Sequence, residues 1–345
     1  MRVAVVNAQV PFVWGGAEEM SFHLTAHLRR TGIDAQLVRI PTFWEPAERL
    51  LDEALAARLL RLDRYDRVIG SKFPSYGIPH RDMRIWLVHQ YRQAYDLWDA
   101  GASNIPDDPR GNALRQAIHD YDLNAFRSAK RLVCVAEPIR QRLQHYMGID
   151  APVCLVPVND EELFADMGRE NYIFAGGRVN GAKRQHLLVE ALALTKSDVR
   201  LVICGPPDGP DDRELLEGLV DRLNLRDRVT LDLRFAERRA LADYANNALA
   251  AAYLPFQEDS VGYVTAEAFL AHKPVLTTTD SGGVLDIVHD GETGYVRKPD
   301  PAHLAEAMDR FAGDRASCIR MGRNGHDVWR ARGISWQRSV AMLMD

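Results

Sequence analysis

The sequence contains no long apolar run and no excess of basic residues. No stretch reaches the roughly 18 apolar residues that a membrane-spanning helix requires. The formal net charge is −5, whereas proteins that bind duplexes depend on clustered lysines and arginines to neutralise phosphates. These absences argue against an integral membrane protein and against nucleic acid as the main partner.

Cysteine is scarce, and the few cysteines are far apart in the sequence. This distribution predicts buried, reduced thiols rather than a disulfide framework or a zinc site. They are Cys134, Cys154, Cys204 and Cys318. The dinucleotide fingerprint G-x-G-x-x-G is also absent, because the Gly-Gly turns near residues 15 and 176 lack its spacing. A nicotinamide-dependent dehydrogenase is therefore disfavoured.

The N-terminal residues MRVAVVNAQVPF carry one arginine and a short apolar run. Such a run is too short for the h-region of a secretion signal, so we expect a buried strand and a cytoplasmic protein. Residues 48–67 predict an amphipathic helix with several arginines. This helix could touch the inner face of an anionic membrane that carries a lipid-linked acceptor. Packing of the helix on the protein core is the alternative.

Short β-branched runs alternate with helical segments along the whole chain, which is typical of parallel α/β sheets. At 345 residues, 46% of them apolar, the chain exceeds the size at which a single core stops growing. We therefore predict an α/β protein with two Rossmann-like, doubly wound domains that face a cleft. The predicted strands are 2–7, 35–40, 67–70, 84–89, 131–135, 153–158, 171–176, 199–205, 229–233, 249–255, 274–279 and 294–296.

A polar segment at 161–171 separates the two series of strands. We place an N-terminal domain at 1–165 and a C-terminal domain at 166–334. Residues 335–345 begin at a serine and predict a terminal helix, which could pack back on the N-terminal domain.

A Gly-Gly turn followed by two cations ends the strand predicted at 171–176. Gly177 and Arg178 lie in this turn, and Lys183 begins the next helix. Glycines let a backbone approach a ligand closely, and cations near a helix N-terminus favour a diphosphate. A plain strand-to-helix turn with solvated cations is the alternative.

The stretch EDSVGYVTAE combines two carboxylates with a helix start. Asp259 is expected in the loop after a strand and Glu267 about one turn into the helix, so both can face one ligand. Carboxylates in such a place suit the vicinal hydroxyls of a sugar. Glu267 could instead be an acid favoured by the helix dipole. The helix start between these acids supplies three further candidate substrate contacts, which are Gly262, Tyr263 and Val264.

A second small-residue turn, Ser281, Gly282 and Gly283, follows the strand predicted at 274–279. Successive backbone amides in such a turn can form an anion-binding nest. A plain glycine turn explains the same residues equally well.

Together, these segments make residues 171–300 resemble the donor-binding domain of the family 4 glycosyltransferases, also called group 1. The matching pieces are GGR followed by Lys183, the D-x7-E arrangement that ends at Glu267, the run FLAHKPVL and the turn SGG. The resemblance implies the two-domain GT-B fold. It also implies transfer of a hexose-like sugar, with retention of configuration, from a nucleotide-diphosphate sugar to a hydroxyl of a glycan, lipid-linked or small-molecule acceptor.

The resemblance also implies roles for the donor-side residues. Arg178, Lys183 and the 281–283 amides would stabilise the departing diphosphate, Glu267 would hold the ribose and Asp259 the donor sugar. We expect neither a metal nor a cofactor. The family usually has Glu at the first acidic position, and here spacing selects Asp259 whereas residue type selects Glu258. Base recognition would come from backbone contacts around 206 and 234–235.

In the first half, a turn at Gly15, Gly16 and Glu18 leads from the first strand into a helix. In the family this turn faces the acceptor and the donor phosphates, although Gly-Gly before a helix is also common loop punctuation. His89 ends a predicted strand, where the family often has a histidine near the donor sugar. A hydrogen-bonded structural histidine is the alternative.

Two further patterns in the first half were considered. Several aromatic residues near His89 could stack on an acceptor or pack in the core. They are Trp86, Tyr91, Tyr95 and Trp98. Asp120 and Asp122 form a D-x-D, the metal signature of another transferase fold, but alternate helical positions point to nearly opposite sides. We therefore predict no metal there.

Two rival functions remain open at this point. A nucleotide-sugar epimerase or hydrolase would share the fold, and a non-catalytic two-domain protein could bind a nucleotide sugar. The sugar, the base, the acceptor and the oligomeric state are not fixed by these patterns.

Overall fold

The computed structural model describes all 345 residues and divides into two compact units. The first unit comprises Met1–Pro157 and Ile334–Asp345, and the second comprises Val158–Gly333. We expected the second domain to begin at residue 166, but the second unit begins at Val158. The reason is that the segment after Pro157 is bonded to the second unit: the Asn246 side chain donates to the Leu163 carbonyl at 2.7 Å and accepts from the Ala165 amide at 2.9 Å.

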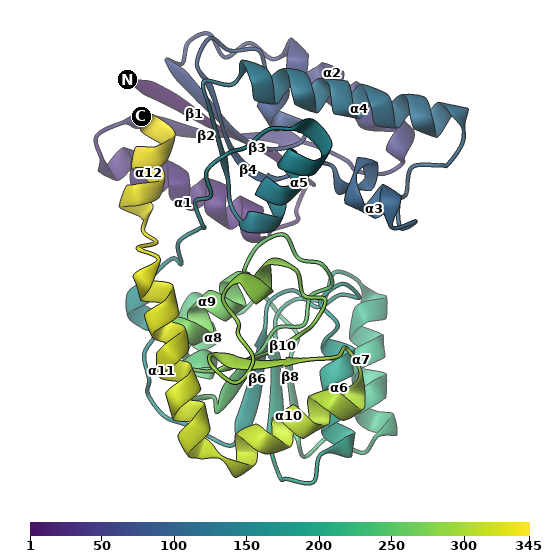
Figure 1. Cartoon of the computed structure of the whole chain (residues 1–345), viewed down its shortest axis with the longest axis vertical. Helices are drawn as coiled ribbons and strands as arrows, with labels where there is room; N and C mark the ends of the chain where they lie inside the picture. The colour runs from purple at the N-terminus through teal and green to yellow at the C-terminus, as the bar shows by residue number, and fades with distance from the viewer. The chain divides into compact units, whose positions relative to one another are not determined.

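The first unit contains a five-stranded parallel sheet with the order β2-β1-β3-β4-β5 (Figure 1). Its strands are β1 Arg2–Gln9, β2 Asp34–Pro41, β3 Arg67–Lys72, β4 Met83–His89 and β5 Arg131–Cys134. β1 pairs with β2 through Val5 and Leu37 and with β3 through Val5 and Ile69. Val5 is buried because β1 is paired along both edges and helices cover the sheet, as is usual for parallel sheets.

The strand predicted at 153–158 is wrong. Only an isolated bridge joins Val153 to Cys134, and the chain then leaves the sheet. Pro152 precedes this run and Pro157 lies within it, and a proline has no amide to donate to a ladder. Between the two prolines, Cys154 and Leu155 are buried in a connecting segment instead.

The helices of the first unit include one from the end of the chain. They are α1 Gly16–Arg30, α2 Leu50–Leu59, α3 Asp96–Asp99, α4 Pro109–Ser128, α5 Glu137–Met147 and α12 Trp336–Met344. α12 lies beside α1 (Figure 1) and is capped by Ser335, which accepts from the Arg338 amide at 3.2 Å. Arg84 and Arg131 donate to carbonyls of its last turn at 2.8 and 3.1 Å. These bonds satisfy carbonyls that a helix end leaves unpaired, and they fix the terminal helix on the first unit.

The D-x-D of α4 places its two carboxylates in different environments. Asp122 is fully buried and accepts hydrogen bonds from the hydroxyls of Tyr76 at 2.6 Å and Tyr95 at 2.8 Å. Asp120 is exposed and accepts from Gln116 at 3.0 Å. Burial raises the pKa of Asp122 to about 7, although the two tyrosine hydroxyls act in the opposite direction.

This buried carboxyl predicts a pH-dependent stability. Because the folded-state pKa of Asp122 lies above its unfolded value, folding favours the proton, and stability falls as the pH rises through about 7. Between pH 6 and pH 8 this group should cost about 1.4 kcal/mol of unfolding free energy. Asp122→Asn should remove that part of the slope in urea unfolding at the two pH values. Parallel profiles for variant and wild type would contradict the prediction.

The second unit contains a six-stranded parallel sheet with the order β11-β10-β9-β6-β7-β8. Its strands are β6 Tyr172–Gly176, β7 Arg200–Cys204, β8 Val229–Asp232, β9 Ala250–Ala252, β10 Val275–Thr278 and β11 Gly294–Arg297. Its helices are α6 Gln185–Leu194, α7 Pro210–Arg222, α8 Arg238–Asn247, α9 Tyr263–Leu270, α10 Pro301–Gly313 and α11 Arg315–Ala331. All six strands match predicted runs to within a few residues.

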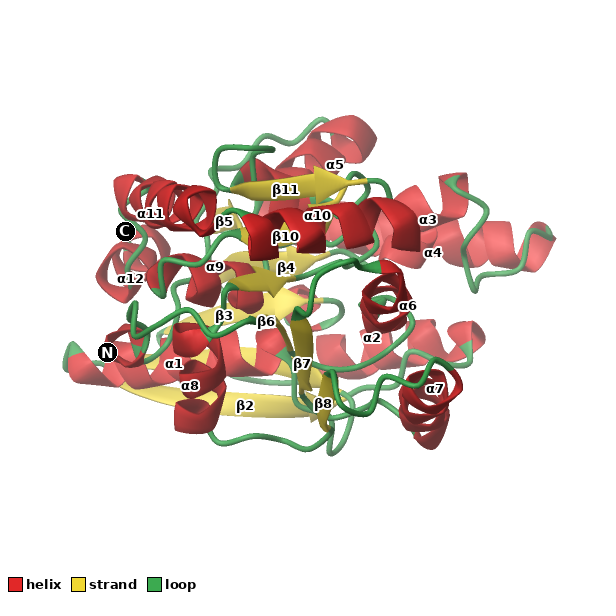
Figure 2. Ribbon diagram, turned by 90° about the horizontal axis from the view of Figure 1, so that it is seen from below, coloured by secondary structure: helices red, strands yellow, loops and turns green.

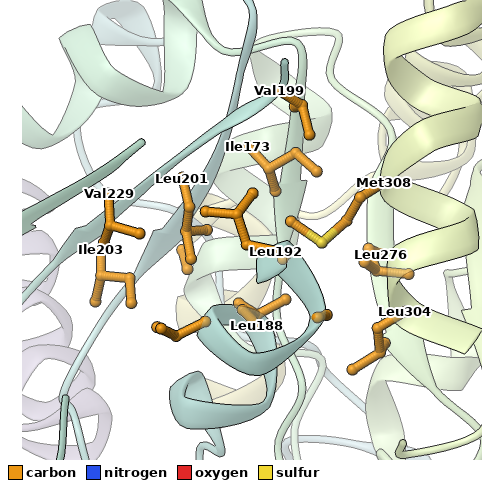
Figure 3. Packing of buried hydrophobic residues seen from close by; sticks show 14 of the residues in the cluster. Ile173, Leu188, Leu192, Val199, Leu201, Ile203, Val229, Leu276, Leu304 and Met308 are labelled. Atoms are coloured by element: carbon orange, nitrogen blue, oxygen red, sulfur yellow. The ribbon is translucent and has the colours of Figure 1, made fainter. Parts of the chain in front are cut away.

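Helices cover both faces of this sheet. α6, α7 and α10 pack on one face, and α8, α9 and α11 lie on the other (Figures 1 and 2). Figure 3 shows Leu188 and Leu192 of α6 and Met308 of α10 against Ile173 and Leu201 of the sheet. All five are buried. This core holds the sheet rigidly below the loops at its carboxyl edge.

Short 3₁₀ helices connect several elements. They are η1 Ala47–Arg49, η2 Ser75–Gly77, η3 Arg92–Ala94, η4 Glu161–Leu163 and η5 Gly283–Asp286. The four cysteines are free and buried, as predicted. No helix of the chain combines the length and the apolar character needed to cross a bilayer.

Candidate active site

The candidate residues of the second unit lie on loops that follow neighbouring strands. The order β10-β9-β6-β7 places four strand ends side by side. Because the carboxyl ends of parallel strands meet at one edge, the loops after these strands converge. Arg178 and Lys183 follow β6, Glu258 and Asp259 follow β9, and the 281–283 turn follows β10.

The loops after β6 and β7 touch each other through glycines. A Cβ on Gly205 would lie 2.0 Å from the Gly177 carbonyl oxygen, so only glycine fits there. This close approach brings Arg178 to Asp208, and its Nη1 lies 2.9 and 3.0 Å from the two carboxylate oxygens. Asn180 donates to the same carboxylate at 2.8 Å. Arg178 is thus held by an acid that the sequence did not single out.

Lys183 lies in a triangle with Tyr253 and Glu258. Its ammonium donates to the Tyr253 hydroxyl at 2.9 Å and to the Glu258 carboxylate. The Tyr253 hydroxyl also donates to Glu258 at 3.1 Å. Burial would lower the pKa of Lys183, but Tyr253 and Glu258 outweigh it and raise the pKa, so the ammonium stays charged.

The two candidates for the first acidic position differ in burial and in partners. Asp259 is 6% exposed, whereas the side chain of Glu258 is 24% exposed and paired with Lys183. Gly262 is left-handed, with φ of 74°, and a Cβ there would lie 2.3 Å from the Tyr253 ring. The turn at Gly262 therefore packs on Tyr253 and fixes where Asp259 leaves the loop.

The 281–283 turn does not present the amides that an anion nest requires. The Ser281 amide donates to the Thr278 carbonyl at 3.1 Å, and the Gly283 amide donates to the Glu258 carbonyl at 2.7 Å. Gly282 is left-handed, and a Cβ there would lie 2.2 Å from the Glu258 carbonyl oxygen. The expectation that these amides bind phosphate is therefore wrong for Ser281 and Gly283, because a carbonyl at the end of β10 occupies the first and a carbonyl of the loop after β9 occupies the second. The glycine turn instead lets two loops pack closely.

Glu267 lies on α9 and is buried. Its carboxylate is 2.5 Å from Nη1 of Arg238, the first residue of α8. Arg238 also donates to the Asn159 carbonyl at 2.8 Å and lies 4.7 Å from the centre of the Phe164 ring. An arginine that the sequence analysis missed thus orients the second acid.

Tyr263 and Val264 begin α9, and Val264 is buried. Its side chain would lie 3.5 Å from a Cβ placed on Gly177, so α9 starts against the turn after β6. Near the positions expected to bind the base, Arg234 pairs with Asp232 at 2.7 Å and Phe235 is 69% exposed.

In the first unit, the turn at residues 15–18 forms a capping box. The Glu18 carboxylate accepts from the Gly15 amide at 3.0 Å and from Lys72, at the end of β3, at 2.8 Å. Burial raises the pKa of Glu18, but Lys72 and a hydrogen bond from Asn7 outweigh it and lower the pKa. Lys72 pairs in register with His89, so these groups meet at the carboxyl edge of the first sheet. The Nδ1 of His89 lies 2.9 Å from the Gln90 carbonyl.

The aromatic residues near His89 serve mainly the core. Trp86 is fully buried and donates to the Cys154 carbonyl at 3.0 Å, and Tyr95 is fully buried against Asp122. These two cannot stack on an acceptor, and the core alternative is correct for them. Tyr91 is also buried, whereas Trp98 is half-buried and packs with Arg115 at 5.2 Å.

The amphipathic helix predicted at 48–67 is shorter than expected, because α2 ends at Leu59. Ala54 and Ala57 face the core. Leu51, Leu55 and Leu59 are 40%, 57% and 66% exposed and recur every four residues, so they share one outward face. Core packing therefore accounts for the buried alanines of α2 and does not account for its exposed leucines.

Comparison with known proteins decides the family. Residues 160–328 match the family model described as Glycosyl transferases group 1. The second unit belongs to this family. The resemblance inferred from the GGR, D-x7-E and SGG motifs is confirmed, and the chain therefore carries a glycosyltransferase domain.

Curated relatives share the same half of the chain. The D-inositol 3-phosphate glycosyltransferase of Xylanimonas cellulosilytica is 32% identical over 175 residues, which is 50% of this chain and 41% of that protein. The human Alpha-1,3/1,6-mannosyltransferase ALG2 is 28% identical over 174 residues, 46% of this chain and 40% of that protein. The alignments thus span about two fifths of each relative.

Solved glycosyltransferase structures resemble the whole chain. Sucrose-phosphate synthase from Thermosynechococcus elongatus has a TM-score of 0.76 at 18% identity and covers 99% of this chain and 97% of its own. WaaG, a glycosyltransferase involved in lipopolysaccharide biosynthesis, has a TM-score of 0.72 at 16% identity, with 99% of both chains covered. Anabaena HepE in complex with UDP and glucose has a TM-score of 0.73 at 16% identity and covers 100% of this chain and 98% of its own. These likenesses confirm the predicted GT-B fold.

Proposed function

We propose that this chain is a metal-independent, retaining glycosyltransferase. It transfers a hexose-like sugar from a nucleotide-diphosphate sugar to a hydroxyl of a glycan, lipid-linked or small-molecule acceptor. One observation carries this proposal: two cations and two acids, Arg178, Lys183, Asp259 and Glu267, are brought to one sheet edge in the unit that matches the family.

The chemistry of the proposed reaction is electrostatic. Negative charge develops on the diphosphate as the glycosidic bond breaks, and preorganised cations stabilise it most where water is limited. Arg178 and Lys183 supply these charges, and in the structure they pair with Asp208 and Glu258. No side chain is assigned as a nucleophile on the sugar, so we favour front-face transfer, in which the acceptor attacks on the side that the diphosphate leaves.

The two acids would bind the neutral parts of the donor. Asp259 would accept hydrogen bonds from sugar hydroxyls, and Glu267 would accept them from the ribose. Arg238 orients Glu267, since a buried carboxylate needs a cation or donors nearby. In the first unit, His89 and the turn at 15–18 are the proposed acceptor-side residues.

A nucleotide sugar as donor is supported by the structures of HepE, which were obtained with UDP and with UDP-glucose. We propose a cytoplasmic location. Three exposed arginines, Arg58, Arg61 and Arg64, lie at and after the end of α2, near its outward leucines in the sequence. This combination suits peripheral contact with an anionic membrane surface. Such contact would bring the enzyme to a lipid-linked acceptor.

Thermal-shift measurements with UDP, GDP, ADP and dTDP test the donor site. Binding to the folded state stabilises by mass action, so a nucleotide at about 100 times its Kd should add about 2.7 kcal/mol. We expect one of the four to raise the melting temperature by the same amount with and without EDTA. Stabilisation that disappears in EDTA and returns with Mn²⁺ would contradict the metal-independent site. No shift with any of the four would contradict a nucleotide-sugar donor.

A further inference from the structure

Lys183, assigned above to a donor phosphate, is bound to a carboxylate in the structure. Its Nζ contacts Glu258 and the Tyr253 hydroxyl together. A phosphate that approaches Lys183 therefore meets an acid of the same charge. Glu258 lies immediately before Asp259. Of these two neighbouring acids, Asp259 is proposed to bind the donor sugar, whereas Glu258 would oppose a phosphate at Lys183.

The backbone of Glu258 is fixed, whereas its side chain is accessible. Its carbonyl accepts from the Gly283 amide at 2.7 Å, and Glu258 forms a parallel bridge with Gly282. The side chains of Lys183 and Glu258 are 21% and 24% exposed. The carboxylate that pairs with Lys183 is therefore partly accessible to solvent, on a loop whose backbone is bonded to the neighbouring turn.

Lys183 keeps a second partner if Glu258 moves. The Tyr253 hydroxyl lies 2.9 Å from Nζ, and the ring centre lies 5.2 Å from it. Tyr253 itself is buried and packed against Gly262. The ammonium would therefore stay at the sheet edge, available to another anion.

We propose that Glu258 is an internal competitor whose carboxylate occupies Lys183 in place of a phosphate. This proposal rests on the proposed function, which places a donor diphosphate at Lys183. A single phosphate gains only the contact that Glu258 gives up. A diphosphate can reach Arg178 as well, which contacts Asp208 through Nη1 and has further N–H donors on its guanidinium. Two charge-assisted contacts then outweigh the one that is lost at Lys183. Glu258 would thus exclude weakly bound phosphates while admitting a diphosphate.

The test uses inorganic phosphate and inorganic pyrophosphate as probes, because neither depends on the nucleotide base. Glu258→Gln keeps the size and the hydrogen-bonding oxygen of the side chain and removes its charge. By calorimetry, the full-length variant is expected to bind pyrophosphate and phosphate each about 10-fold tighter than the wild type, because both probes displace the same carboxylate from Lys183. The ratio of the two affinities should therefore be unchanged by the substitution.

Two controls separate competition from a general change of charge. Glu217→Gln removes the same charge from an exposed pair with Arg213 on α7 and should leave both affinities unchanged. Adding Lys183→Gln to Glu258→Gln should abolish the gain, because coupled residues give non-additive effects.

Unchanged or weaker pyrophosphate binding by Glu258→Gln would overturn the proposal and make Glu258 a residue that positions Lys183. Undetectable pyrophosphate binding in both proteins would overturn it as well. Tighter pyrophosphate binding that requires Lys183, in a chain that no nucleotide stabilises, would uphold the competition and contradict the proposed function. The two ideas therefore fail separately.

Discussion

Lys183→Ala is expected to lower turnover about 100-fold or more, the order seen when one charge-stabilising donor is lost. The variant removes the ammonium from the sheet edge and leaves the Glu258 carboxylate without that partner, beside the place proposed for the diphosphate. Arg178→Ala should cause a loss of the same order, since Arg178 supplies the second charge. Initial rates with saturating donor measure both effects.

Lys196→Ala is the matched control. Lys196 is exposed and precedes β7, so it lies at the opposite edge of the same sheet. We expect this variant to turn over at the wild-type rate. Near-normal rates in both Lys183→Ala and Arg178→Ala would mean that the phosphates bind elsewhere.

Asp259→Ala is expected to lower turnover on the order of 10²-fold with little loss of nucleoside-diphosphate affinity. Asp259 is buried close to the turn at Gly262, and we assign it to the donor sugar and not to the nucleotide. Glu258→Ala should stay within a few-fold of the wild-type rate. Turnover and equilibrium binding, measured on the same preparations, separate the two acids.

Glu267→Ala completes this comparison, because this variant is expected to lose nucleotide affinity, which Asp259→Ala should keep. Removing the carboxylate that Arg238 orients should weaken nucleotide binding itself. An inactive Glu258→Ala together with a normal Asp259→Ala would show that residue type, rather than spacing, selects the first acid.

Periodicity in the sequence was sufficient to predict most of the fold. Buried parallel strands and their crossover helices leave local patterns, and eleven of the twelve predicted strands correspond to β1 to β11. The failure at 153–158 has a local cause, because Pro152 and Pro157 remove donors from a run whose apolar character still looks like a strand.

The candidate site was predicted only where a residue lies next to its strand end. Arg178, Lys183 and Asp259 lie in the segments between a strand and the next helix, and the topology then brings these segments to one edge. Their partners come from distant segments: Arg238 reaches Glu267 across 29 positions and Lys72 reaches Glu18 across 54. Pairing over such separations depends on tertiary packing and leaves no local pattern.

Tyr253 is the one missed partner that the sequence could have suggested. Its hydroxyl stands at the end of the apolar run LAAAY, shortly before the acidic loop. Buried tyrosine hydroxyls usually find a hydrogen-bond partner. The amides of Ser281 and Gly283 were wrongly assigned to phosphate. The sequence does not show that the carbonyls of Thr278 and Glu258 already accept from these amides, and Glu258 comes from another loop.

The most direct measurement follows a labelled sugar. The full-length chain is incubated with nucleotide sugars labelled in the sugar, together with a mixture of glycan, lipid-linked and small-molecule acceptors, and the products are separated and identified by NMR. We predict release of the free nucleoside diphosphate and a label on an acceptor hydroxyl with the anomeric configuration of the donor. Recovery of the label as an epimerised nucleotide sugar, as free sugar alone or as unchanged donor would contradict a glycosyltransferase, and an inverted anomeric centre would contradict retention.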